Sequence, residues 1–331
     1  MHSEVSFETI DTHTAGEPTR IVLEGIDESM TGSGSVREMR DEFAAESDWV
    51  RRLLMQEPRG HANMFGAVIV DAEADADVGA FFMDSGGYQD MCGHGVIGIT
   101  TALVEEGMVD ASDEVTIETP SGVVTAHPTV EDGRVESVTM RNVPSFVFTE
   151  VELDVDVGAG RTRTVDVDVV YSGNFTALVD ASQFDAPIGE EDADVYREYG
   201  RQIWETLDAE YEFVHPFHGE SYPASVIEFY ETGAVDQNVV VFGAGAQIDR
   251  SPCGSGTCAK ATYLYDRGDL ALGESYPYES VIETRFEARI TDADARDEYV
   301  VTEPEVTGSA YVTGRHTFVK QPDDPVTGFR L

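Results

Sequence analysis

Two short segments of the chain combine a cysteine with closely spaced glycines. Each reads Cys-Gly-x-Gly, at residues 92–95 and 253–256, and each opens a run with almost no charged residue. Such a run predicts a helix that is buried on nearly all sides. The first N–H groups of a helix have no partner within it and can bind a carboxylate. A cysteine placed there is expected to have a stabilised thiolate, with a pKa below the usual value of about 8.5.

The two segments also match each other. Aligning Cys92 with Cys253 gives six identical residues in sixteen positions. This similarity predicts an ancient duplication, with two halves that are each built on one buried helix and wrapped by strands. Taken singly, either cysteine could instead be a small buried hydrophobic residue, with glycines that permit close packing.

If the halves face each other, the two sulfurs lie on opposite sides of one anionic substrate. One thiolate would remove a proton from one face of a carbon, and the other thiol would return a proton to the opposite face. Helix N–H groups on the substrate carboxylate would stabilise the developing negative charge. The pattern therefore favours inversion of a stereocentre.

Residues beside the cysteines differ between the halves. His94 stands where the second half has serine, and Asp249 stands where the first half has tyrosine. Unlike flanks indicate a substrate with unlike ends, and we assign both residues to its amine side. The alternatives are a helix-start histidine bonded to backbone and an aspartate that caps a turn or forms a local ion pair. Cys258, inside the second helix, is interpreted as a structural buried thiol.

Most of the remaining chain has the period-two alternation of half-buried strands. Amphipathic helices are predicted at residues 36–56 and 192–211. The predicted strands include residues 5–10, 21–25, 67–70, 115–118, 135–140, 165–171, 225–230, 239–242 and 298–302.

Composition limits the possible partners. The chain has 331 residues, with a formal net charge of −43 and only two lysines. Phosphate backbones and anionic lipids would be repelled, so nucleic-acid and membrane-surface binding are not expected. A uniformly acidic, lysine-poor surface is typical of a protein from a high-salt cytoplasm. No signal peptide is evident, no apolar run approaches the ~20 residues of a spanning helix, and three cysteines do not form a disulfide framework.

With their flanks, the cysteine segments resemble the two signature motifs of the proline racemase family, which includes hydroxyproline epimerases. They read Asp-Met-Cys-Gly-His-Gly at residues 90–95 and Asp-Arg-Ser-Pro-Cys-Gly-Ser-Gly-Thr at residues 249–257. Further similar segments occur at residues 11–20, 57–61 and 172–175, so the resemblance covers residues 6 to about 260.

The resemblance implies a diaminopimelate-epimerase-like α+β fold with two pseudo-symmetric halves. Each half would be a barrel-like sheet around a central helix: residues 1–146 plus 307–331 with the first cysteine, and residues 147–306 with the second. It implies that no cofactor or metal takes part, and it suggests a homodimer. The implied acid/base pair is Cys92 and Cys253. The implied substrate-binding residues are Gly93, His94, Gly254 and Ser255 for the carboxylate, with His94 and Asp249 at the ring nitrogen.

The substrate stays open between proline and 4-hydroxyproline. Apolar residues 239–242 favour proline slightly, because a pocket built to bond the hydroxyl would need a polar group. A branch of the family that dehydrates trans-3-hydroxyproline carries threonine in place of Cys253, which argues against that activity. Two departures from the family pattern are a segment at residues 242–248 that is one residue longer and Ser255 in place of a common threonine.

Three other classes of protein share part of this pattern. A thiol–disulfide oxidoreductase would need Cys-x-x-Cys, which is absent, and a zinc site would need more ligands. A catalytically silent amino-acid-binding protein could keep the anion pocket without needing both sulfurs.

Overall fold

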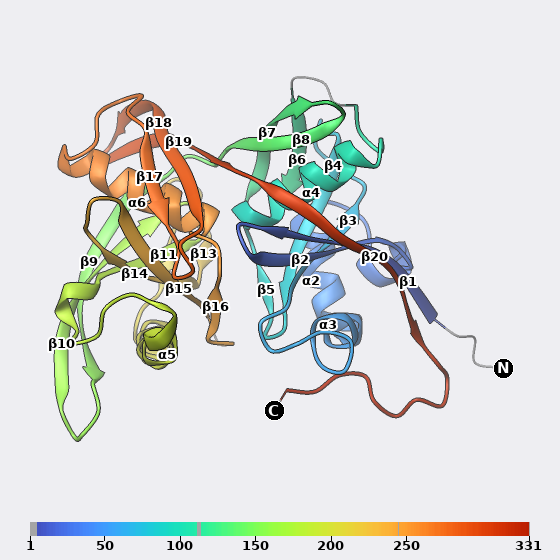
Figure 1. The fold of residues 1–331 in the computed structure, drawn as a ribbon, viewed down its shortest axis with the longest axis horizontal. Coiled ribbons are helices and arrows are strands. Elements are labelled where there is room, and N and C mark those ends of the chain that lie inside the picture. Colours follow the sequence, from blue (N-terminus) through green and yellow to red (C-terminus); the bar gives the residue numbers. More distant parts are fainter. Residues whose placement is uncertain (1–4, 111–113, 244, 331) are drawn as a thin grey trace. The chain divides into compact units, whose positions relative to one another are not determined.

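The computed structural model describes residues 5–110, 114–243 and 245–330, and the chain divides into two compact units (Figure 1). Unit 1 comprises Met1–Met140 and Gly308–Leu331, and unit 2 comprises Arg141–Thr307. The sequence prediction placed the first boundary six residues later. Unit 2 begins earlier because backbone N–H groups of Asn142 and Ser145 donate to Pro304 O (3.0 Å) and Thr302 O (2.9 Å). Both units are rich in strands with few helices, which confirms the predicted α+β class.

Unit 1 is built from strands around one central helix. Its sheet runs in the order β20-β1-β2-β3-β4-β6-β7, with the short β5 also paired to β4. The central helix, α4, is buried from Gly93 to Leu103. The strands are β1 (Val5–Thr14), β2 (Glu17–Glu24), β3 (Phe65–Val70), β4 (Val78–Asp84), β5 (Tyr88–Gln89), β6 (Val115–Thr119), β7 (Gly122–Glu131), β8 (Arg134–Arg141) and β20 (Ala310–Lys320), and the helix is α4 (Gly93–Glu105).

Unit 2 follows the same plan. Its sheet runs β9-β10-β11-β14-β15-β17-β18, with the short β16 also paired to β15. The central helix, α6, is buried from Gly254 to Tyr263. The elements are β9 (Phe146–Asp156), β10 (Thr162–Tyr171), β11 (Phe175–Asp180), β12 (Phe213–Val214), β13 (Ser221–Tyr222), β14 (Ala224–Glu231), β15 (Asp236–Phe242), β16 (Gln247–Asp249), α6 (Gly254–Arg267), β17 (Tyr276–Glu279), β18 (Arg285–Arg296) and β19 (Tyr299–Gly308).

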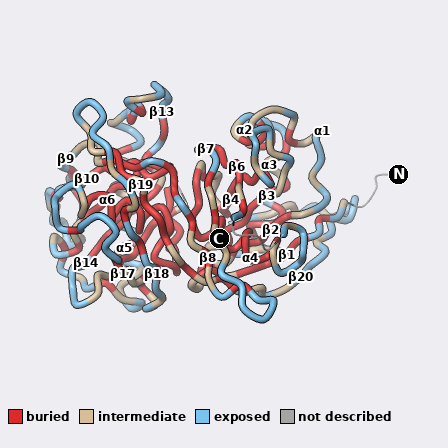
Figure 2. Tube along the Cα trace, turned by 90° about the horizontal axis from the view of Figure 1, so that it is seen from above, coloured by how far each residue is buried: buried red, intermediate tan, exposed pale blue. Residues whose placement is uncertain are grey.

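The two sheets also share one sequence of strand directions. Along each order, neighbouring strands pair antiparallel, antiparallel, parallel, antiparallel, parallel and antiparallel. Strands β3, β4, β5 and β6 of unit 1 thus correspond to β14, β15, β16 and β17 of unit 2. In each unit the central helix is buried among the strands (Figure 2).

The peripheral helices differ from the prediction in one place. The predicted helix over residues 36–56 is two helices, α2 (Val36–Glu46) and α3 (Asp48–Met55). Ser47 leaves the helical conformation (φ −127°, ψ 15°), and the two helices separated by this break pack Phe43 and Val50 in the same apolar cluster. A second helix was predicted at residues 192–211 and is confirmed as α5 (Ala193–Glu210), while α1 (Glu28–Thr31) is a single turn. No helix in the described ranges is long and apolar enough to cross a membrane.

A buried ion pair within the β1–β2 hairpin also contacts α3. Arg20 Nη2 and Nε donate to the carboxylate of Asp11 at 2.8 and 3.1 Å. Arg20 Nη1 also donates to the carbonyls of Leu54 (2.6 Å) and Arg59 (2.7 Å). Removing one partner of a buried pair is costly because it leaves an uncompensated charge.

Arg20→Met is therefore expected to lower the free energy of unfolding by about 3–5 kcal/mol. Denaturant unfolding monitored by circular dichroism measures the change. Arg52→Met, at an exposed position of α3, is the matched control. Equal effects of the two substitutions would contradict a dominant role for the Arg20–Asp11 pair.

Candidate active site

Cys92 forms the N-cap of α4. Its sulfur accepts the N–H of Gly95 at 3.1 Å, and its carbonyl accepts the N–H of Val96 at 3.0 Å. The side chain is only 4% exposed. A side-chain carbon at Gly95 would lie 2.9 Å from the sulfur, so glycine is required there. The first turn of α4 thus holds a buried sulfur among its own amides.

His94 lies in the same turn and contacts the sulfur. Its ring nitrogens Nδ1 and Nε2 are 3.4 and 3.5 Å from Cys92 Sγ. The ring packs edge-on against Phe65, and the hydroxyl of Thr14 donates to the His94 carbonyl at 2.8 Å. An imidazole beside a thiol can accept or donate its proton. Unit 1 therefore brings together three of the predicted residues: Cys92, Gly93 and His94.

Cys253 caps α6 in a different backbone conformation. Its sulfur accepts the N–H of Gly256 at 3.4 Å and lies 3.6 Å from Ser255 Oγ. Its φ of 63° and ψ of 117° are rare for a residue with a side chain, whereas Cys92 is extended. The Cys253 N–H donates to Ser251 Oγ at 3.1 Å, which helps to hold this strained residue.

The electrostatic prediction was wrong for Cys253. Burial raises the pKa of this thiol well above its usual value, and the carboxylates of Asp249 and Glu228 raise it further. The Gly256 amide opposes these effects but does not outweigh them. The helix N-terminus alone would have stabilised the thiolate, but a dry site with acidic neighbours favours the neutral thiol.

Asp249 lies at the end of β16 and is 1% exposed. Its Oδ1 accepts the N–H of Ser251 at 2.8 Å, so it stabilises the turn that leads to Cys253. The sequence alignment set it opposite Tyr88. In unit 2, Asp249 of β16 pairs with Val240 of β15, and in unit 1, Gln89 of β5 pairs with Phe82 of β4. Because β15 and β16 correspond to β4 and β5, the strand register makes Gln89 the counterpart of Asp249. Unit 2 therefore brings together the predicted residues Asp249, Cys253, Gly254 and Ser255.

Three buried polar residues in the core of unit 2 were not predicted as part of the site. Tyr278 Oη donates to Glu228 Oε1 at 2.7 Å, and Lys260 Nζ lies 3.1 Å from the centre of the Tyr230 ring. Glu228, Lys260 and Tyr278 are each at most 1% exposed. A signal was available: Glu228 interrupts an apolar strand, and Lys260 is the one charge in the first part of the predicted helix.

Cys258 is fully buried in α6, and burial raises the pKa of its thiol. All three cysteines, which lie within the described ranges, are thiols and not disulfides. Within those ranges no group of three or more His, Cys, Asp or Glu side chains is placed to hold a metal ion.

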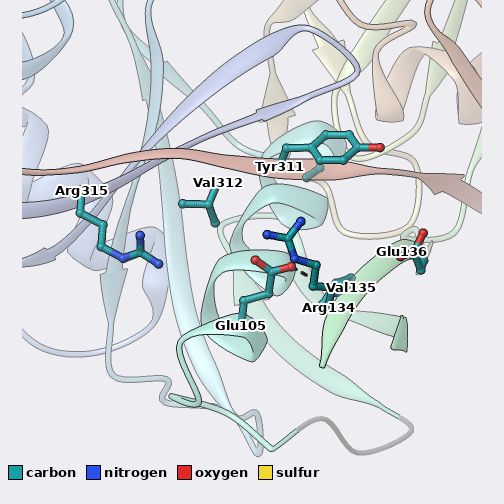
Figure 3. A pocket seen from close by; sticks show the side chains of 8 residues that line it. Glu105, Arg134, Val135, Glu136, Tyr311, Val312 and Arg315 are labelled. Atoms are coloured by element: carbon teal, nitrogen blue, oxygen red, sulfur yellow. Dashed lines mark hydrogen bonds between the residues drawn. The ribbon is translucent and has the colours of Figure 1, made fainter. Parts of the chain in front are cut away.

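A pocket of about 240 Å³ in unit 1 lies at the other end of α4 (Figure 3). Glu105, the last residue of α4, accepts the N–H of Val135 there at 3.2 Å. The thirteen-residue helix separates this pocket from Cys92 by roughly 20 Å. The pocket is therefore separate from the thiol site. Its lining consists of Glu105, Arg134, Val135, Glu136, Ala310, Tyr311, Val312 and Arg315.

Comparison with known proteins identifies relatives over almost the whole chain. The family model described as "Proline racemase" matches residues 9–330. A proline racemase from Acetoanaerobium sticklandii is 38% identical over 96% of both chains. A trans-3-hydroxy-L-proline dehydratase from Bacillus cereus is 36% identical over 98% of both chains. A 4-hydroxyproline 2-epimerase from Streptosporangium roseum is 35% identical over the full length of both.

The fold has a solved counterpart. A hydroxyproline epimerase from Agrobacterium vitis, determined with bound trans-4-hydroxy-L-proline, superposes with a TM-score of 0.89 at 26% identity. The superposition covers 100% of this chain and 97% of the other. From the matched motifs, the fold and these relatives, the chain belongs to the proline racemase family.

Proposed function

We propose that the protein is an amino-acid racemase or epimerase that inverts the α-carbon of proline or 4-hydroxyproline, with proline slightly favoured. The observation that carries this proposal is the repeated arrangement of a buried cysteine at the N-cap of a buried helix, with its sulfur on the first-turn amides. The membership in the family supports the same substrate class.

In the proposed reaction, Cys92 and Cys253 act on one substrate molecule. The thiolate of one cysteine takes the α-proton and becomes a thiol, while the electron pair moves toward the substrate carboxylate. The thiol of the other cysteine then gives its proton to the opposite face and becomes a thiolate. One proton is lost and one is gained, so the substrate is inverted without oxidation or reduction and without a cofactor.

The first-turn amides would bind the substrate carboxylate. The N–H groups of Gly93, His94, Gly254 and Ser255 lie where helical hydrogen bonds are not yet available, and they can stabilise the enolate-like charge. His94 and Asp249 are proposed to contact the ring nitrogen. Burial of both sulfurs keeps water from competing for the proton.

The relatives carry three different activities at nearly equal identity, so identity does not select the substrate. The presence of Cys253 favours a two-thiol inversion over the dehydration of 3-hydroxyproline, which uses threonine at that position in the family pattern. The apolar side chains of Val239, Val240 and Val241 are fully buried, which is compatible with an apolar wall. The main competing activity is 4-hydroxyproline 2-epimerisation. An amino-acid-binding protein without turnover is the non-enzymatic alternative.

The acidic surface supports a working environment of high salt, where ions screen the self-repulsion of a charge of −43. We propose that the protein works in such a cytoplasm, as a homodimer. Activity assays therefore belong in concentrated salt.

Polarimetry tests the proposed function. Purified protein, in concentrated salt with a reductant and no added cofactor, is incubated with L-proline or with trans-4-hydroxy-L-proline. Optical rotation is expected to fall to zero with proline and to change much more slowly with hydroxyproline. The opposite preference would identify a 4-hydroxyproline 2-epimerase and overturn the apolar-wall argument. No change with either would reject both substrates, and dehydration of trans-3-hydroxyproline would be assayed next.

A further inference from the structure

A polar group is buried between α6 and the sheet of unit 2. It consists of Glu228 from β14, Tyr278 from β17 and Lys260 from α6, and the hydrogen bond between Tyr278 and Glu228 is 2.7 Å long. Burying ionisable side chains costs free energy that apolar residues of similar size would not cost. Their presence in the core therefore calls for a reason beyond packing.

Unit 1 forms the same kind of core without these three polar side chains. Glu228 of β14 pairs with Val240 of β15, and Ala67 of β3 pairs with Phe82 of β4, so Ala67 is the counterpart of Glu228. By the pairings of β17 and β6, Ile117 is the counterpart of Tyr278. On the central helix, Lys260 aligns with Ile99. These counterparts in unit 1 are apolar and fully buried: Ala67, Ile99 and Ile117. The same framework thus folds around an apolar core in one unit and a charged core in the other.

The carboxyl group of Glu228 lies beside Gly256, in the first turn of α6, close to Cys253. A side-chain carbon at Gly256 would overlap Glu228 Oε2 and would lie 3.3 Å from Cys253 Sγ. The carboxyl group and the sulfur are therefore close neighbours beside the first turn of α6. At the matching place in unit 1, Gly95 faces the ring of Phe82. The surroundings of the two sulfurs therefore also differ here, since Cys253 has a buried carboxyl group beside its capping amide.

We propose that Glu228 is a positioning residue that keeps the Cys253 sulfur protonated in the resting protein, so that Cys253 is the proton donor at the start of turnover and Cys92 the acceptor. This rests on the proposed function in one respect only, that the proton on Cys253 is used for catalysis. Tyr278 holds the carboxyl group by its hydrogen bond, and the charge of Lys260 favours the ionised carboxylate in the core.

Electrostatics support this assignment. Burial raises the pKa of Glu228 to about 7, while the Tyr278 hydrogen bond and the charge of Lys260 act in the opposite direction. Above that pH the carboxylate is charged and opposes ionisation of Cys253. The raised pKa of the thiol follows from burial first, then Asp249, then Glu228. The titratable groups that interact with Glu228 or Cys253 come from three elements, β16, α6 and β17: Asp249, Cys258, Lys260, Tyr276 and Tyr278.

The decisive experiment measures ionisation of Cys253 directly. The Cys92→Ser variant is treated with iodoacetamide over a range of pH, and the rate of modification of Cys253 is followed by peptide mass. Glu228→Gln in this background removes the charge at constant size. The alkylation profile is expected to move to lower pH by about one unit, so that alkylation at a fixed pH below the midpoint is about tenfold faster.

Glu231→Gln is the matched control. It makes the same change on the same strand at an exposed position, and its profile should equal that of Cys92→Ser alone. Glu228→Met, which removes the same charge with a side chain of similar length, gives a second variant should Glu228→Gln fold poorly, and a shift in the same direction is expected. An unchanged profile in these variants, or an equal shift in the control, would overturn the assignment. A shift without wild-type racemisation would instead overturn the proposed function and leave the electrostatic role of Glu228 standing.

Discussion

Replacing either Cys92 or Cys253 by serine is expected to reduce racemisation by at least about a thousandfold in both directions. General acid–base groups each contribute about 10²–10⁴ to a rate, and a serine hydroxyl is a much weaker acid than a thiol. Each direction of the proposed reaction uses one sulfur as base and the other as acid, so neither can be spared. Polarimetry on both enantiomers of proline measures the loss.

Cys258→Ala provides the control, since this third thiol is fully buried within α6 and has no proposed part in the chemistry. It should retain most activity, with a modest loss of stability from the small cavity. Near-normal turnover of Cys92→Ser or Cys253→Ser in either direction would reject the two-thiol reaction. Thermal unfolding of each variant separates a chemical loss from a folding defect.

Gly256→Ala is expected to lower racemisation by about a hundredfold and to destabilise the protein by about 1–3 kcal/mol. The added methyl group would overlap Glu228 Oε2 and would lie 3.3 Å from Cys253 Sγ. Either the first turn of α6 or the carboxyl group must move, and both position the sulfur. Kinetics with proline and denaturant unfolding measure the two effects.

Gly87→Ala is the comparison, because nothing lies within 4 Å of a side-chain carbon at that position. It should leave both activity and stability almost unchanged. If Gly256→Ala behaved in the same way, the close packing between α6 and Glu228 would not be needed for function.

The central helices could be predicted because their sequences carry an unusual signal. Residues 92–103 contain no charged side chain, and a helix without a polar face has to be buried. The Cys-Gly-x-Gly pattern further located each sulfur at the first turn, where the structure has it as N-cap. Strand existence was also predictable from alternation, although strands such as β4 were missed because every residue from Val78 to Asp84 is buried and alternation is lost.

The rest depended on tertiary contacts that a single sequence does not contain. The break at Ser47 follows from packing of α2 and α3 on one core, while the residues on both sides have helical periodicity. The raised pKa of Cys253 follows from burial first, then from Asp249, and then from Glu228, which lies 25 residues away in the chain on a strand of the sheet. The counterpart of Asp249 was misassigned because counting back from the cysteine ignores the register of β5 and β16.

The return of the C-terminal strand to unit 1 determines the order in which a ribosome can complete the two units. Strand β20 pairs with β1 from Val5↔Lys320 to Thr14↔Ala310. The sheet of unit 1 therefore lacks its edge strand until residues 310–320 have been synthesised. Unit 2 is continuous from Arg141 to Thr307 and is fully available earlier. The unit that is translated first is therefore finished last, and a prematurely terminated chain would expose the open edge of β1 to other strands.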